Sequence, residues 1–386
     1  MRFNPIYENL IAIINSAIKN QKLKSEVISK LSEDEIKKVY KLLTFHNLGH
    51  ILYGAVKFNQ IDISSAFNKE LENSYIKASI NDENIAFQHK NVILALEKAK
   101  INHITLKGET LKSYYPKNFI RPSCDIDILV EPKNLKKATK IIKEQTGVKK
   151  VERNYHDITI TTNSGVLIEL HFSLKENNEK LDKITAEPFK NAYLVDGKEY
   201  EYKLNDEFLF AYLLSHLAYH LTSGGLGIKA FIDLYLFKNA VCLNEEKLIK
   251  IIKKGELQEF YNKINEFISV WFGDKQHNEF TRLFEEFVIL GGVYGTAEQK
   301  NAVLSVKSNG KENRLLRKVF LPYNTLKEYY PILEKLAILY PIFIVVRLVK
   351  VLFNKDRAKR AKKEINSSIT NDKKQNIERL FQELNI

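Results

Sequence analysis

Apolar residues in the first hundred positions recur at three- and four-residue spacing, the period of an amphipathic helix. Residues 6–18 and 32–43 follow this period. Ser32 and Glu35 have the spacing of a capping box at the start of the second stretch. A further helix is predicted over residues 82–100. The N-terminal part of the chain is therefore expected to be helical.

The pattern changes after residue 100, where short apolar runs alternate with helical stretches. Asn163, Ser164 and Gly165 form a tight-turn sequence between two of these runs. Helices are expected near residues 109–115 and 134–145. Strands are predicted over residues 103–106, 125–130, 148–152, 156–162, 166–172 and 201–204. Strands that alternate with helices and end in a hairpin indicate a small mixed α/β domain.

The remainder reads as helical up to a basic, polar tail. Helices are predicted over residues 207–221, 229–237, 245–272, 279–289 and 324–353. The expected fold is mixed α/β (α+β): a small mixed-sheet core flanked by N- and C-terminal helical domains. The predicted regions are an N-terminal helical region, the α/β core, a C-terminal helical domain and the tail, at residues 1–84, 85–204, 205–353 and 354–386.

Two carboxylates one residue apart lie inside an apolar strand, in the sequence CDIDILV. Side chains alternate along a strand, so Asp125 and Asp127 project from one face while Ile126 and Ile128 face the core. Adjacent carboxylates repel each other unless a cation lies between them. Mg²⁺ or Mn²⁺ is the natural cation for such a pair.

A third carboxylate, Glu169, lies in the later strand VLIELHF, where Glu169 and His171 share a face. A glycine turn, LKGE, follows the first strand of the core. Carboxylates from two strands with a glycine turn are a combination suited to metal-assisted phosphoryl transfer.

With these motifs the chain resembles the uncharacterised nucleotidyltransferase family of the DNA polymerase beta-like superfamily. The resemblance lies in ITLKGETL, IRPSCDIDILV and IELHF, and it extends over roughly residues 85–353. It implies an enzyme that moves a nucleoside monophosphate from a nucleoside triphosphate to a hydroxyl of an acceptor and releases pyrophosphate.

The resemblance also implies roles for individual residues. Asp125, Asp127 and Glu169 would be the catalytic carboxylates and the metal ligands, with Glu169 as an alternative general base. The nucleotide would contact Lys107, Gly108 and Arg121. Apart from the resemblance, His171 and Lys229 are further candidates for contact with the nucleotide, with a hydrogen bond to Glu169 as the alternative for His171.

One feature departs from the superfamily pattern, in which Gly-Ser or Gly-Gly forms the turn. Here Glu109 follows Gly108, which places an acid where phosphate is expected. This departure supports a second hypothesis, a degenerate module that binds a nucleotide or docks on a partner without catalysis.

The formal net charge of +13 favours anionic partners, although the lysines are scattered among acids. The acceptor is left open between a small molecule, a protein and tRNA, the last as in toxin–antitoxin nucleotidyltransferases. Only two cysteines and no signal-peptide pattern predict a cytoplasmic protein. Residues 336–353 are too short and too charged to span a membrane, and they are expected to form a buried helix. The basic run at 355–363 keeps a peripheral membrane contact as an alternative.

Four polar residues of the helical part have no assigned role. His216 and His220 lie four apart on one helix face and are expected to line a cleft or pack in a bundle, with a metal site as the alternative. Lys229 and Asp233 have the spacing of an intrahelical ion pair. Arg347 would need a carboxylate or phosphate partner if it were buried.

Overall fold

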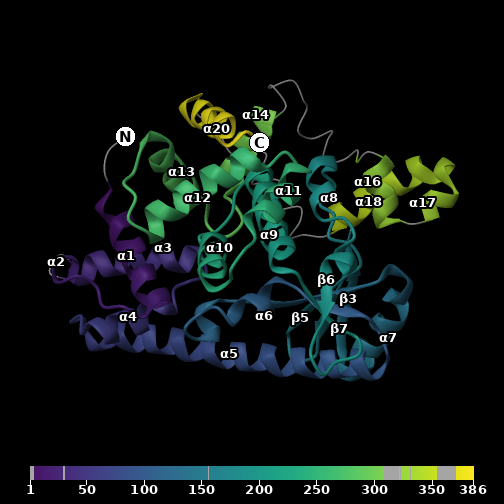
Figure 1. Cartoon of the computed structure of the whole chain (residues 1–386), viewed down its shortest axis with the longest axis horizontal. Coiled ribbons are helices and arrows are strands. Elements are labelled where there is room, and N and C mark those ends of the chain that lie inside the picture. The colour runs from purple at the N-terminus through teal and green to yellow at the C-terminus, as the bar shows by residue number, and fades with distance from the viewer. Residues whose placement is uncertain are drawn as a thin grey trace.

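A single sheet crosses the lower half of the molecule, with helices above it and one long helix along the lower edge (Figure 1). The computed structural model describes residues 4–28, 31–154, 156–307, 321, 323–330, 332–353 and 371–386. The mixed α/β fold expected from the sequence is confirmed.

The helices expected before the sheet are present: α1 (Pro5–Lys19), α2 (Ser25–Ile28), α3 (Glu33–Phe45), α4 (Ile51–Asn59) and α5 (Ser65–Lys98). The predicted capping box is confirmed, because the Ser32 backbone N–H donates to the Glu35 carboxylate at 3.1 Å and Ser32 Oγ accepts from the Glu35 backbone. Helix α5 begins well before residue 82, where the sequence pattern placed its start. Phe67 and Leu71 extend it because they pack in the core of the N-terminal helices.

The sheet contains seven strands in the order β3-β4-β5-β2-β1-β7-β6. Two neighbouring pairs, β2–β5 and β1–β7, are parallel, and the other pairs are antiparallel. The strands are β1 (His103–Thr105), β2 (Asp125–Val130), β3 (Val148–Arg153), β4 (Asp157–Thr162), β5 (Leu167–His171), β6 (Ala192–Leu194) and β7 (Glu201–Leu204). Between and beside them lie α6 (Lys107–Lys112), η1 (Asn118–Ile120), η2 (Pro132–Asn134), α7 (Leu135–Thr146), α8 (Glu179–Ile184) and η3 (Pro188–Asn191).

One face of the sheet is covered by α5 and α7. Ile126, Ile128 and Ile168 are fully buried there in one apolar cluster with residues of both helices. Side chains alternate along a strand, so the residues between these isoleucines project from the opposite face. That face is therefore the one available for polar chemistry.

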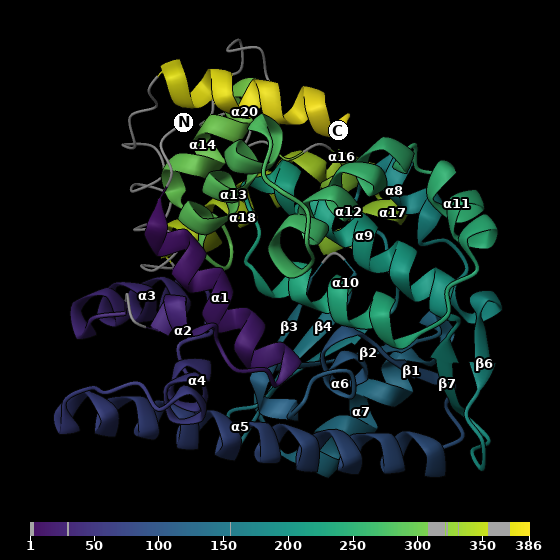
Figure 2. The same ribbon diagram turned by 60° about the vertical axis from the view of Figure 1, so that its left-hand side comes forward.

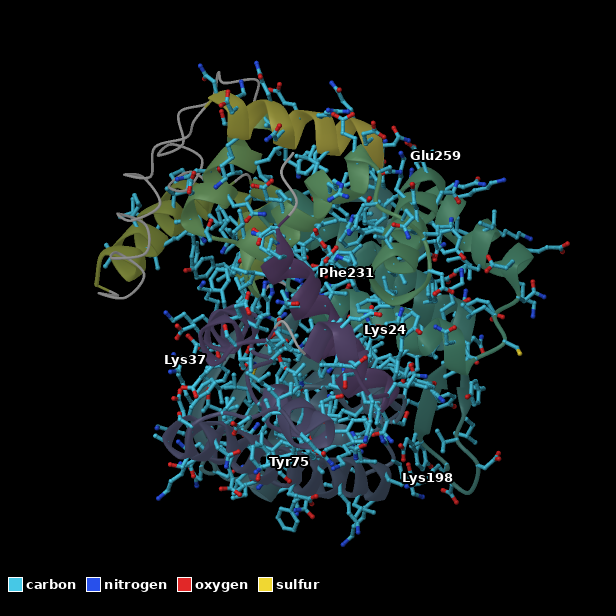
Figure 3. All side chains as sticks on the ribbon, turned by 90° about the vertical axis from the view of Figure 1, so that its left-hand side faces the viewer. Lys24, Lys37, Tyr75, Lys198, Phe231 and Glu259 are labelled. Carbon is cyan, nitrogen blue, oxygen red and sulfur yellow. The ribbon has the colours of Figure 1, made fainter. Side chains whose placement is uncertain are left out.

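The C-terminal helices lie on the opposite side of the sheet from α5, as Figures 1 and 2 show. They are α9 (Asp206–Ser223), α10 (Lys229–Ala240), α11 (Glu245–Lys253), α12 (Gln258–Phe272), α13 (Glu279–Gly291), α14 (Ala297–Lys307) and α20 (Asn371–Leu384). Their core also contains residues of α1, α3 and α4. Phe231, fully buried, lies in the interior of this helical part (Figure 3).

Residues 245–272, predicted as one helix, form two. The break lies at Gly255, where a Cβ would come within 2.4 Å of Ile184 Cδ1, so a side chain has no room there.

The prediction of one helix over residues 324–353, buried over residues 336–353, is wrong. The chain forms α16 (Tyr323–Tyr329), α17 (Ile332–Lys335), η4 (Ala337–Leu339) and α18 (Tyr340–Phe353). Pro341, which lacks an N–H, lies in the first turn of α18, a position that favours a helix start. Ile338 is 84% exposed and Ile342 is 56% exposed. No helix in the described part of the chain is both long and apolar enough to cross a bilayer.

Candidate active site

The parallel pairing of β2 with β5 brings the predicted carboxylates together. Asp127 lies directly opposite Glu169 in this register, on the sheet face that α5 and α7 leave uncovered. His171, two residues beyond Glu169, shares that face, and its Nε2–H donates a hydrogen bond to Asp127 Oδ1 at 2.8 Å. The strand alternation predicted from the sequence thus places the three side chains in one group.

Asp127, Glu169 and His171 each offer a ligand atom, and these atoms lie within 4.8 Å of one another. Such a set can hold a divalent cation. Asp125 lies at the start of β2, half-buried, with its Oδ1 3.3 Å from the Ser123 hydroxyl. The group in the structure therefore contains His171, where the sequence had placed Asp125. A second group shares His171 and adds His156 and Asp157.

The two paired carboxylates have opposite electrostatic environments. Burial and the neighbouring charges of Asp127 and Asp125 raise the pKa of Glu169 to about 7. Burial also acts to raise the pKa of Asp127, but the Lys107 ammonium and the His171 hydrogen bond outweigh it and hold that pKa below its usual range. At neutral pH Asp127 is ionised and Glu169 retains part of its proton. A cation fits this group because it would replace that proton and relieve the repulsion.

Mn²⁺ affinity is expected to rise about tenfold per pH unit up to pH about 7 and then to level off, because Glu169 must lose its proton first. Because the pKa of Glu169 is higher in the folded than in the unfolded chain, protonated Glu169 stabilises the cation-free fold at low pH. This stabilisation is lost as pH rises through about 7. Calorimetric titration of Mn²⁺ at several pH values measures the first effect. Glu169→Gln is the control, and a slope that survives in this variant would assign the proton to another group.

Lys107 connects the sheet to α9. Its Nζ lies 3.3 Å from His216 Nε2 and 5.3 Å from the centre of the Tyr212 ring. His216 Nδ1 lies 2.7 Å from a Glu176 carboxylate oxygen, and His220 Nε2 lies 2.9 Å from His216 Nε2. Because Lys107 can only donate, the network assigns the His216 proton to Nδ1, where Glu176 accepts it.

Both histidines of α9 are neutral at pH 7. Burial and then the Lys107 charge hold the pKa of His216 far below its usual range. Burial and His216 lower the pKa of His220 to about 2. In the described part of the chain, neither histidine belongs to a group of candidate metal ligands. They line the same cavity as the carboxylates, as expected; His216 contacts Lys107 directly, and His220 contacts His216.

The glycine turn packs closely against the segment that leads into β2. Gly108 is buried, and a Cβ there would come within 3.1 Å of Ser123 Oγ and 3.7 Å of Arg121 Nη1. Lys107, just before it, has a φ of 27°, a left-handed conformation that is strained for a side-chain residue. The turn therefore presents its backbone directly beside Arg121 and Asp125.

Arg121 forms a buried bidentate ion pair with Asp233, at 2.7 Å through Nε and 2.8 Å through Nη2. Tyr115 donates to the same carboxylate at 2.7 Å. Burial opposes ionisation of Arg121, but Asp233 outweighs it and raises the Arg121 pKa. Nη1 is buried without a hydrogen-bond partner in the described structure, and Arg121 lines the cavity. One donor of Arg121 is thus left for an anion.

The predicted intrahelical pair of Lys229 and Asp233 is wrong, because Arg121 and Tyr115 take the Asp233 carboxylate. Lys229 Nζ instead donates to the Pro122 carbonyl at 3.3 Å. Burial and the Arg121 charge lower the Lys229 pKa. Lys229 lines the cavity beside Arg121, so both cations border the same space.

Glu109 does not point an unpaired charge at this space. Its carboxylate pairs with Lys112, which also pairs with Asp82 of α5 at 2.6 Å. Lys112 is buried between the two acids. The acid that departs from the superfamily pattern therefore belongs to a structural ion cluster.

The cavity has a volume of about 600 Å³ and is bordered by both the sheet and α9. Its lining includes every site residue predicted from the sequence: Lys107, Gly108, Arg121, Asp125, Asp127, Glu169, His171 and Lys229. Sequence reasoning missed Glu176, His156 and Asp157, because no motif or spacing in the chain links them to the carboxylate strands. Arg347, left unassigned above, lies over the Tyr329 ring at 5.8 Å and not in the lining.

The sequence model of a family described as uncharacterised nucleotidyltransferase matches residues 32–273. This match covers well over half of the 386 residues. The chain belongs to the uncharacterised nucleotidyltransferase family. No curated protein and no solved structure matches the chain.

The nucleotidyltransferase match begins at the cap of α3 and ends just after α12. It therefore contains the sheet, α9 and α10, and with them the carboxylates, Lys107 and the Arg121–Asp233 pair. Membership in this nucleotidyltransferase family supports nucleotidyl transfer in general terms, with a nucleoside triphosphate as substrate.

Proposed function

We propose that this protein is a metal-dependent nucleotidyltransferase that transfers a nucleoside monophosphate from a nucleoside triphosphate to an acceptor hydroxyl. The observation that carries the proposal is the pairing of Asp127 with Glu169 on one sheet face, with Lys107 beside them. In this reaction the acceptor oxygen forms a bond to the α-phosphorus. The bond between the α-phosphorus and the oxygen that bridges it to the β-phosphorus breaks, and pyrophosphate leaves.

The carboxylates would hold the cation at the reacting groups, and the basic residues would bind the phosphates. Asp125, Asp127 and Glu169 would hold Mg²⁺ or Mn²⁺, with His171 orienting Asp127 through its hydrogen bond. When bound, the cation neutralises phosphate charge and lowers the pKa of the attacking hydroxyl. A carboxyl with a pKa of about 7, such as Glu169, is also suited to accept the proton of that hydroxyl.

The phosphate end would lie against the basic border of the cavity. Lys107, Arg121 through Nη1, and Lys229 supply positive charge there. Gly108 allows the backbone to approach a phosphate, since a Cβ would fill the space toward Ser123.

A non-catalytic binding module is the second candidate function, and Glu109 was its main support. The pairing of Glu109 with Lys112 weakens that support, because the acid does not oppose an anion in the cavity. The retained carboxylates favour catalysis.

The acceptor class stays open between a small molecule, a protein side chain and tRNA. The net charge of +13 favours a polyanion, and toxin–antitoxin, cytoplasmic and peripheral-membrane assignments remain predictions. Binding to tRNA that weakens steeply with salt would select the polyanion.

The deciding experiment incubates the protein with Mg²⁺ or Mn²⁺ and each of the four labelled nucleoside triphosphates, alone and with cell extract. The Asp125→Ala/Asp127→Ala variant is the control. Label transfer or pyrophosphate release by the wild type alone supports the proposal, and the labelled species identifies the acceptor class. Absence of nucleotide binding by the wild type with either cation refutes it; binding without turnover favours the non-catalytic module.

A further inference from the structure

Helix α5 is 34 residues long and only its inner side is covered. The inner side contributes Phe67 and Leu71 to one core and Ile85 and Val92 to the other. Both views of the ribbon show α5 along the lower edge of the molecule (Figures 1 and 2). Its outer side therefore faces away from the sheet and from the cavity.

The outer side carries a row of four large apolar residues. Ile76 is 47% exposed, Ile80 65%, Phe87 62% and Leu94 51%. At about 100° per residue, these four side chains lie within about 40° of one another around the helix axis. An apolar row of this kind, unlike scattered single residues, marks an interaction surface.

Two charged residues complete the row. Glu83 and Lys90 are exposed and fall between the apolar positions, so that the row reads Ile76, Ile80, Glu83, Phe87, Lys90 and Leu94. The spacing is four, three, four, three and four residues, which is the a/d pattern of a coiled-coil seam. No ion pair joins Glu83 or Lys90 to another residue in the ranges that the structure describes.

We propose that α5 pairs with α5 of a second copy of this chain, in antiparallel orientation. When Ile76 of one copy lies opposite Leu94 of the other, every position of the row meets a position of the partner's row. Glu83 then lies one helical turn from the partner's Lys90, within reach of a long side chain. Two-fold symmetry forms this contact twice.

Charge decides the orientation. A parallel, in-register pair would place Glu83 against the partner's Glu83 and Lys90 against the partner's Lys90, and like charges facing each other are destabilising. In the antiparallel pair each Glu83 lies three positions from the partner's Lys90 and four from the partner's Glu83, so the two attractions outnumber the one repulsion, and the two lysines are ten positions apart. The charges therefore favour the antiparallel pair over the parallel, in-register pair.

The pairing would leave both cavities open, because α5 covers the sheet face opposite the carboxylates. The row from Ile76 to Leu94 is about 27 Å long at 1.5 Å per residue. That is a short interface, below the size of most permanent dimers. We therefore expect a dissociation constant on the order of micromolar.

Sedimentation velocity of the full chain between about 1 and 100 µM tests the proposal directly. The wild type is expected to shift from monomer to dimer over this range. Phe87→Glu places a charge at the centre of the row and is expected to raise the dissociation constant at least about 100-fold. Leu290→Glu, which changes an exposed apolar residue on α13, is the control and is expected to leave dimerisation unchanged.

Exchanging the charges of Glu83 and Lys90 distinguishes this specific pairing from non-specific hydrophobic association. Glu83→Lys and Lys90→Glu are each expected to weaken the dimer about tenfold, because each creates like-charge contacts. The double exchange restores the attraction and is expected to return within about threefold of wild type. All variants change exposed side chains, so melting temperatures measured well below the dissociation constant, where every protein is monomeric, should stay the same. If the variant with both exchanges dimerises as weakly as the variants with one exchange, the proposal is overturned.

Cross-linking tests the orientation. With Cys124 and Cys242 replaced by serine, proteins carrying Ile76→Cys or Leu94→Cys are mixed and oxidised. Antiparallel pairing yields the mixed disulfide between positions 76 and 94. A wild type that stays monomeric at 100 µM, or disulfides only between identical positions, overturns the proposal. Neither result bears on nucleotidyl transfer, which each chain's own cavity would perform.

Discussion

Replacing Asp127 with asparagine is expected to lower kcat/KM for nucleotidyl transfer by at least about 10³-fold, because the variant loses the charge that faces Glu169, His171 and Lys107. Asparagine keeps the volume of the side chain. The fold should persist, since the isoleucines on either side of Asp127 anchor β2 in the core. Pyrophosphate release and thermal melting measure the two effects separately.

Glu131→Gln is the matched control for Asp127→Asn. Glu131 directly follows β2 and bonds to Asn102 and Asn134, and it does not line the cavity. Activity close to that of the wild type is expected. If Asp127→Asn kept more than about a tenth of the wild-type rate, the carboxylate pair would not be the catalytic centre.

Removing either partner of the Arg121–Asp233 pair is expected to lower the free energy of unfolding by about 3–5 kcal/mol, because the remaining charge is buried without compensation. Asp233→Ala also leaves the Tyr115 hydroxyl without its acceptor. Arg121→Met/Asp233→Leu removes both charges and is expected to be more stable than either single variant. Urea unfolding of the four proteins measures these differences.

The exposed pair of Lys180 and Glu256 provides the comparison for this experiment. Lys180→Met should leave the unfolding midpoint within error, because solvent screens an exposed pair. Nucleotide binding by the double variant separates the structural role of Arg121 from its proposed role in phosphate binding. A stable double variant that also binds nucleoside triphosphate as tightly as the wild type would show that Nη1 contacts no phosphate.

Local sequence pattern was sufficient to predict six of the seven strands, all but β6, and the sheet face that carries the carboxylates. The alternation of Asp125, Ile126 and Asp127 placed the carboxylates on one face of a strand, since side-chain direction along a strand is a property of the backbone. The same reasoning placed Glu169 with His171. Both inferences hold in the structure because each uses residues of a single element.

The same local reasoning was wrong where a distant partner decides the outcome. Lys229 and Asp233 have the spacing of a helical pair, yet Arg121 takes the carboxylate through two hydrogen bonds and leaves Lys229 to a backbone carbonyl. Glu109 was read as an acid in a phosphate site, and its partner Lys112, which also pairs with Asp82, places it in a structural cluster. A bidentate contact from 112 residues away cannot be read from helix spacing.

The sequence by itself therefore determined the composition of the strands that carry the carboxylates, the glycine turn and the resemblance to nucleotidyltransferases, because these depend on the order of residues within one element. Tertiary structure alone decided that Asp127 lies beside Glu169, that Glu176 and His216 hold Lys107, and that α5 leaves an apolar row exposed. The physical reason is the same in each case: strand register, burial and ion pairing are set by residues that are distant along the chain and become neighbours only when it folds.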